Sequence, residues 1–195
     1  MPLKALIKKA RDFRRDTRGT VAVETVIMWP GLFLAMLAMA VLFDAYRARS
    51  TTDKAAFAIS DMLSRETAAV TFDYLDGARS LFSEISSVRS DHDLIVSLVT
   101  WDTVNDTHRL GWSHSITEDG AEDTLAWDNT DMINMSDNLP TLVDGESIVV
   151  VQTNSTFVPP TILRRWWGDN WDGVALNTLV FSRPRFVSNL AWSDA

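Results

Sequence analysis

Residues 20–43 are the feature of this sequence that most restricts its fold. The segment reads TVAVETVIMWPGLFLAMLAMAVLF, which is 24 residues with one charged side chain, Glu24. As a helix it is about 36 Å long, and the hydrocarbon core of a bilayer is about 30 Å thick. A core helix of a soluble protein is rarely apolar on every face over such a length. The segment is therefore predicted to be a transmembrane helix, with a buried core helix as the alternative.

The charge of the chain changes sign at this segment. Residues 1–19 contain seven basic and two acidic residues, a net charge of +5. Because the whole chain carries −8, the other 176 residues carry −13. A basic flank before a membrane helix places the N-terminus in the cytoplasm by the positive-inside rule. We therefore expect residues 1–19 to be a basic cytoplasmic leader, and the chain after residue 43 to lie outside the cytoplasmic membrane.

Two residues at the start of the apolar segment have a defined spacing. Gly19 ends the basic leader, and Glu24 is the fifth residue after it. A carboxylate within hydrocarbon costs at least a few kcal/mol, so an acid inside a membrane helix is a functional candidate. The position of Glu24 near the helix start lowers that cost, because the positive end of the helix dipole is close.

This arrangement resembles the type IV prepilin signature, and most of all the TadE-like pseudopilins of tight-adherence (Flp) pilus systems. The resemblance covers about residues 18–66 and includes Pro30, which is expected to kink the helix. It implies that a prepilin peptidase cleaves between Gly19 and Thr20. It also implies that the new amino group of Thr20 meets Glu24 of a neighbouring subunit and sets the register between them. Many prepilins have a hydrophobic residue where this chain has Thr20.

The same resemblance implies what the protein does. It would be a minor pseudopilin, a pilus assembly protein without catalytic activity or cofactor. It would lie single-pass in the bacterial inner membrane or be incorporated in a pilus, with its head periplasmic or extracellular. Its partners would be prepilin peptidase, other pilins and pseudopilins, the inner-membrane assembly platform and membrane lipid. Nucleic acid is not an expected partner, because the chain is acidic overall.

Three other interpretations of the N-terminus remain open. Ala38-Met39-Ala40 is typical of a signal-peptidase site, so the segment could be a cleaved secretory signal. It could also be an uncleaved anchor for an extracytoplasmic binding domain with no pilus role. An anchored envelope enzyme is the third alternative, although no familiar catalytic motif occurs in the sequence.

The chain after the membrane segment predicts an α+β fold. Residues 44–90 are expected to be an amphipathic helical stalk, with a break at residues 50–53 and a second helix at 72–89. Residues 91–195 are expected to be a β-rich, antiparallel head. Its predicted strands are 94–101 (central, because it is apolar on both faces), 108–116, 146–158 and 174–187, with Pro184 near the end of the last. This order matches the general architecture of pilin-like proteins.

The predicted head has few candidates for chemistry. His108 and His114 on one strand would be about 20 Å apart, too far for one metal ion, so no metal site is expected. The acidic stretch 118–145 is interpreted as a solvated loop, with calcium binding as the alternative. A tryptophan-rich segment is either a partner-binding loop or a cover for the sheet; it contains Arg164, Arg165, Trp166, Trp167 and Trp171.

Overall fold

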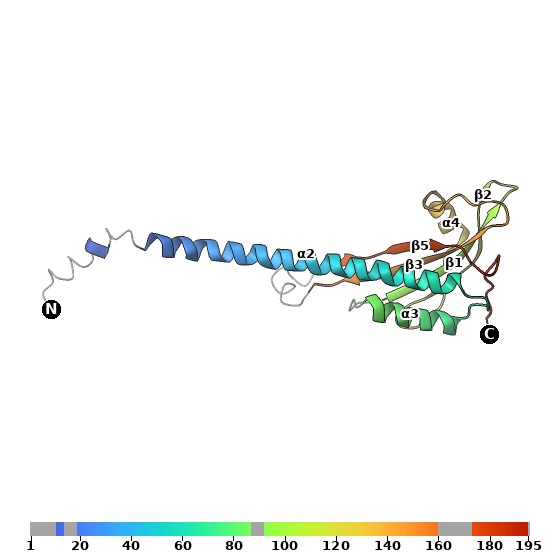
Figure 1. Cartoon of the computed structure of the whole chain (residues 1–195), viewed down its shortest axis with the longest axis horizontal. Helices are drawn as coiled ribbons and strands as arrows, with labels where there is room; N and C mark the ends of the chain where they lie inside the picture. Colours follow the sequence, from blue (N-terminus) through green and yellow to red (C-terminus); the bar gives the residue numbers. More distant parts are fainter. Residues whose placement is uncertain (1–10, 14–18, 87–91, 160–172, 195) are drawn as a thin grey trace. The chain divides into compact units, whose positions relative to one another are not determined.

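The computed structural model describes residues 11–13, 19–86, 92–159 and 173–194 (Figure 1). The chain divides into two units, residues 1–44 and residues 45–195. Helix α2 (Thr20–Ser64) begins in the first unit and ends in the second. The fold is α+β as predicted, with one long apolar N-terminal helix, shorter helices and a small antiparallel sheet.

Helix α2 is continuous over 45 residues, so the break predicted at residues 50–53 is wrong. The hydroxyl of Thr51 lies within hydrogen-bonding distance of the Arg47 and Ala48 carbonyls of its own helix. The carboxylate of Asp53 accepts a hydrogen bond of 2.7 Å from the hydroxyl of Thr178. These polar side chains therefore serve the helix and a tertiary contact, and none of them caps a new helix.

The sheet contains β1 (His92–Asp102), β2 (Thr107–Ile116), β3 (Ser147–Phe157), β4 (Val174–Ala175) and β5 (Thr178–Ser182). Every pair is antiparallel; the order is β2-β1-β3-β4, and β5 also pairs with β3. The first three predicted strands are confirmed. The fourth is two short strands instead of one, and β5 ends before Pro184, which has no backbone N–H to donate to a ladder.

Strand β1 is central and buried on both faces, as its sequence predicts. Leu94, Val96 and Leu98 point to a core shared with helix α3 (Phe72–Ser86) and the Ala45–Ser64 part of α2. Ile95 and Val99 point to a second core on the other face of the sheet. Within residues 45–195 the helical segment and the sheet therefore share one hydrophobic core.

The acidic stretch forms the cover of that second face. It contains a short helix, α4 (Asn129–Met135), and a 3-10 helix, η1 (Ser136–Asn138), where the sequence predicted only a loop. Trp127, Met132, Leu139 and Leu142 are buried against the sheet. Isolated apolar residues among acidic ones gave no periodic signal, so the cover could not be recognised from the sequence.

The C-terminal segment closes the unit against its first helices. The backbone N–H of Arg185 donates to the carbonyl of Ser64 at the end of α2, at 2.8 Å. Val70, in the connection between α2 and α3, donates to Ala191 and accepts from Ser193, both at 2.9 Å. The two ends of the unit's sequence are therefore joined by main-chain hydrogen bonds.

Candidate functional site

The predicted cleavage bond lies where α2 begins. Gly19 is an exposed turn residue, and its carbonyl accepts the N–H of Val23 at 3.1 Å. A Cβ built at Gly19 has nothing within 4 Å, so no close packing demands glycine at this position. The backbone on the C-terminal side of the bond is helical from Thr20 onward.

Glu24 is an exposed side chain one turn into α2, four residues after Thr20 and therefore on the same helix face. Its apolar neighbours Val23 and Ile27 are 60% and 72% exposed. Among the described residues, none forms a hydrogen bond or ion pair with the Glu24 carboxylate. A partner for this charge would therefore have to come from another molecule or from residues outside the described ranges.

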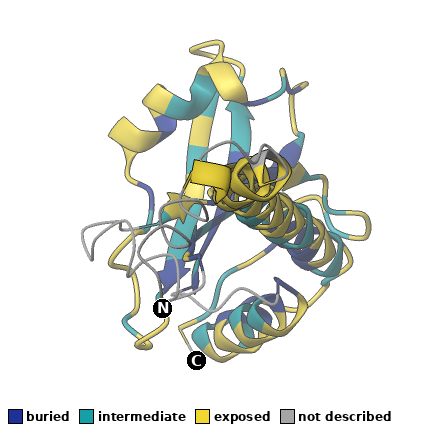
Figure 2. Cartoon of the chain, turned by 90° about the vertical axis from the view of Figure 1, so that its left-hand side faces the viewer, coloured by how far each residue is buried: buried dark blue, intermediate teal, exposed yellow. Residues whose placement is uncertain are grey.

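Most apolar side chains of α2 before Ala45 are exposed, and none of the described ones is buried, as the mainly exposed colour of this part of the helix in Figure 2 indicates. The most exposed of them include Val21, Val26, Ile27, Leu32, Met39 and Phe43, each with 68–73% of its surface exposed. The helix is long and apolar enough to cross a membrane, and no part of its most apolar stretch is buried. A protein in water does not tolerate so large a continuous apolar surface, so this surface requires lipid or other apolar helices.

Pro30 lies inside α2, and the helix continues through it. Proline has no N–H, so the carbonyl of Val26, four residues earlier, loses its usual helical donor. Trp29 and Phe33, on either side of Pro30, stack with ring centroids 6.0 Å apart. The predicted kink at Pro30 stays a prediction.

The three histidines have separate surroundings. His108 Nε2 is 3.0 Å from the carbonyl oxygen of Pro140. His114 Nδ1 is 3.0 Å from the carboxylate of Asp123, and its ring stacks on Trp192 at 3.6 Å between centroids. His92 is buried, with its ring edge-on to that of Phe82. Within the described ranges, no group of three or more His, Asp or Glu side chains is placed to hold a metal ion.

Two aspartates of the acidic cover, Asp119 and Asp128, accept hydrogen bonds from the loop. Asp128 caps α4: its side chain accepts from the N–H of Asp131 and of Thr130, and these bonds lower the pKa of the Asp128 carboxyl. The Thr117 hydroxyl and the Ala121 N–H lower the pKa of Asp119 in the same way. These aspartates are therefore ionised, exposed and held by the loop itself.

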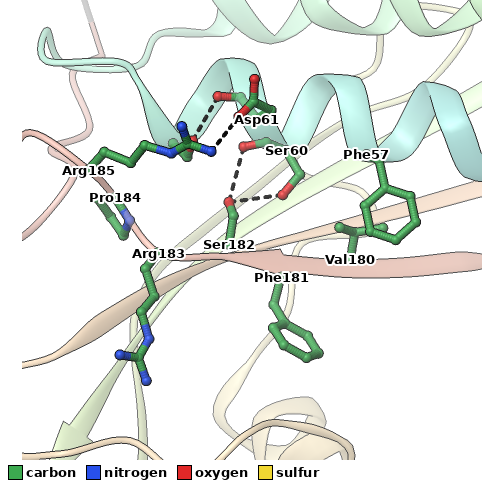
Figure 3. A pocket seen from close by; sticks show the side chains of 10 residues that line it. Phe57, Ser60, Asp61, Val180, Phe181, Ser182, Arg183, Pro184 and Arg185 are labelled. Atoms are coloured by element: carbon green, nitrogen blue, oxygen red, sulfur yellow. Dashed lines mark hydrogen bonds and ion pairs between the residues drawn. The ribbon is translucent and has the colours of Figure 1, made fainter.

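A hollow of about 390 Å³ lies between α2 and β5 within the second unit (Figure 3). The hydroxyl of Ser60 on α2 is 2.9 Å from that of Ser182 on β5. Asp61 accepts a hydrogen bond of 2.8 Å from Arg185 and forms an ion pair, also at 2.8 Å, with Arg65. The helix and the edge strand are thus joined by polar contacts that leave an open hollow beside them.

Two aromatic residues and a further arginine border this hollow, on the two sides of β5. Phe57, on α2, is 62% exposed. Phe181, which is 46% exposed, and Arg183 both point away from α2, and Arg183 pairs with Glu146 at 2.7 Å (Figure 3). None of these residues is among the functional residues predicted from the sequence. The Arg183-Pro184-Arg185 triplet was the available signal, since its two cations are the only charged residues of the stretch 173–193.

The predicted partner-binding loop lies outside the described residues. This applies to Arg164, Arg165, Trp166, Trp167 and Trp171. Comparison of the sequence with protein-family models and curated proteins, and of the fold with solved structures, gives no match.

Proposed function

We propose that this protein is a TadE-like minor pseudopilin of a tight-adherence pilus system. It would be inserted through α2, trimmed by prepilin peptidase between Gly19 and Thr20, and packed with other pilins. The observation that carries the proposal is the combination at the start of α2. An exposed glycine is followed five residues later by an exposed glutamate with no partner among the described residues, at the head of a long uncovered apolar helix.

The electrostatics of this helix start favour a neighbouring subunit as the partner of Glu24. An ionised carboxylate in an apolar environment is tolerable beside an ammonium group and costly without one. Cleavage after Gly19 would create an ammonium group on Thr20, four residues from Glu24 and on the same helix face. The amine of one subunit and the Glu24 carboxylate of the next would then fix the axial register of packed helices.

The first test is the mass and N-terminal sequence of the protein extracted from membranes that contain a prepilin peptidase. A first residue of Thr20 is the expected result. Val41 as first residue would replace the proposal with a cleaved secretory signal, and a retained Met1 would favour a simple anchor. Gly19→Ala should abolish processing. Gly31→Ala is the matched control, because a Cβ at either glycine has nothing within 4 Å.

The second test separates processing from assembly. Glu24→Ala should leave membrane insertion and cleavage intact but reduce the amount of protein recovered with the pilus apparatus. Glu84→Ala, which removes an exposed acid from α3, is the control and should assemble normally. Normal recovery of the Glu24→Ala protein would contradict the proposed register contact.

A further inference from the structure

The apolar part of α2 contains a hydrogen-bond donor and an acceptor that lack their usual partners. Trp29 is 65% exposed, and no described residue accepts a hydrogen bond from its indole N–H. Pro30 has no N–H, so the carbonyl of Val26 loses its usual helical donor. Within residues 21–43, Thr25 is the only other uncharged residue whose side chain has a donor. Its hydroxyl already donates, at 2.8 Å, to a backbone carbonyl of the preceding turn.

The depth of these two groups in the apolar segment makes the missing partners costly. Trp29 is about 14 Å along the helix from Thr20 and about 21 Å from Phe43, so it is far from both ends of the segment. Tryptophan in membrane helices is enriched at the membrane–water interfaces, where its polar tip remains wet. Hydrocarbon offers no partner to an N–H or to a carbonyl. Another protein segment is therefore needed to satisfy both groups.

Both groups lie on one face of α2, and this face is not that of Glu24. Val26 and Trp29 are three residues apart and are therefore neighbours on the helix surface. Phe33 extends the face, since its ring stacks on that of Trp29 with 6.0 Å between centroids. Glu24 lies about 140° away from Trp29 around the helix axis. A contact on the Trp29 face thus leaves the Glu24 carboxylate available for the register contact proposed above.

The charge of the chain determines how two copies of α2 meet in one membrane. The leader of +5 places the N-terminus of every copy on the same side, so the helices are parallel and equal residues lie at equal depth. Side chains lean toward the N-terminus of their helix, which brings the Trp29 indole toward the level of the Val26 carbonyl. A two-fold axis parallel to the helices then places the donor of each copy opposite the acceptor of the other.

From this complementarity we infer that two copies of the chain pair in the membrane through the Trp29 face of α2. The indole N–H of Trp29 in each copy donates to the Val26 carbonyl of the other. This contact rests on the membrane insertion that the proposed function also requires, but it does not depend on cleavage at Gly19.

Cysteine cross-linking of the full-length chain identifies the face in contact. The protein is placed in vesicles of phosphatidylethanolamine and phosphatidylglycerol without a prepilin peptidase, and it has no cysteine of its own. Val26→Cys and Ile27→Cys are a matched pair, because these side chains are 71% and 72% exposed and lie about 100° apart around the helix. On oxidation Val26→Cys should give several-fold more disulfide-linked dimer, since a disulfide requires Cβ atoms about 3.5–4.5 Å apart. Equal cross-linking at the two positions overturns the inference.

Two substitutions in the Val26→Cys chain test the hydrogen bond itself. Trp29→Phe removes the donor and keeps an aromatic ring, whereas Pro30→Ala restores the N–H that occupies the Val26 carbonyl. Each should weaken dimerisation by about threefold or more, the effect of a typical interhelical hydrogen bond in a membrane. The double variant should lose no more than either single variant, because both changes remove the same bond. Met28→Leu is the control at a neighbouring exposed position (59%) and should dimerise normally.

The outcomes separate this contact from the proposed function. Undiminished cross-linking of Trp29→Phe or of Pro30→Ala would overturn the hydrogen bond, and additive losses would show that the two groups are not partners. Because the vesicles contain no peptidase, failure of the cross-link says nothing against cleavage at Gly19. Failure of cleavage in cells would equally leave the cross-link intact.

Discussion

Replacing Ile59 by alanine tests whether the end of α2 is part of the core of residues 45–195. Ile59 is fully buried, and it packs in the cluster that contains residues of α3, β1, β3 and β5. Truncation of a buried isoleucine to alanine costs about 2–5 kcal/mol, from lost transfer free energy and from the cavity left behind. We expect Ile59→Ala to lower the free energy of unfolding by about 3 kcal/mol.

Phe57 is the matched control, two residues earlier on the same helix. It is 62% exposed, so Phe57→Ala should change the free energy of unfolding by less than about 0.5 kcal/mol. A larger side chain is lost at Phe57 than at Ile59, so a ranking by size alone predicts the opposite order. Only the burial of the two residues gives the order expected here.

Tryptophan fluorescence during urea or thermal unfolding of the full-length protein in detergent measures both changes. For a domain of this size, 1 kcal/mol corresponds to about 2–4 °C in Tm, so Ile59→Ala should lower Tm by about 6–12 °C. Equal losses at the two positions, or a loss at Ile59 below about 1 kcal/mol, would refute the assignment of this part of α2 to the core.

Three further predictions concern turns and titrating groups. Gly173 has φ +92°, and a Cβ there would lie 2.5 Å from the carbonyl oxygen of Phe157. Gly173→Ala should therefore lower the free energy of unfolding by about 1–3 kcal/mol. Gly77→Ala in α3 should raise the free energy of unfolding by about 0.5–1 kcal/mol, and urea unfolding measures both changes. Because the pKa of Asp128 is lowered in the folded protein, its capping contribution is complete above the ordinary value of about 3.9 and is lost as pH falls through the lower folded value. Amide exchange at Thr130 and Asp131 should therefore accelerate at that low pH, while in Asp128→Ala it should be fast throughout; a cap that opens already at the ordinary value would contradict this. The pKa of Tyr74 is raised to about 12, mainly by burial of the phenol and also by the negative charge of Glu66. The neutral phenol therefore makes its full contribution to stability below the ordinary pKa of about 10, and this contribution is lost as the pH rises through about 12. Absorbance at alkaline pH should show a late-titrating tyrosine that Tyr74→Phe removes, and its persistence in that variant would exclude the assignment.

Features determined by neighbouring residues could be predicted from the sequence. The apolar length of α2, the two-sided apolar character of β1 and the alternation in β3 each depend on residues a few positions apart. The Gly19–Glu24 spacing at the helix start is of the same kind, and the structure places both residues in exposed positions there. Cleavage at this site stays a prediction.

Features determined by distant residues could not be predicted. The polar residues at 50–53 predicted a helix break, and this prediction was wrong. Asp53 accepts a hydrogen bond from Thr178, 125 positions further along the chain, and the sequence near residue 53 does not show this contact. The hollow at β5 depends in the same way on Ser60 meeting Ser182. The acidic cover packs on the sheet through scattered apolar residues such as Trp127 and Met132. These residues do not recur at a regular spacing, so no sequence pattern reveals them.

The main-chain bonds between the end of α2 and the C-terminal segment have a consequence for biosynthesis. A ribosome releases Ser64 and Val70 long before their hydrogen-bonding partners Arg185 and Ala191. The sheet is also incomplete until β5 has been made, since β5 is the last of the described strands and pairs with one edge of β3. The core of residues 45–195 therefore closes only after synthesis has passed about residue 193. Residues 45–195 therefore stay unfolded during most of their synthesis. A protein-conducting channel requires this unfolded state of the polypeptide that passes through it.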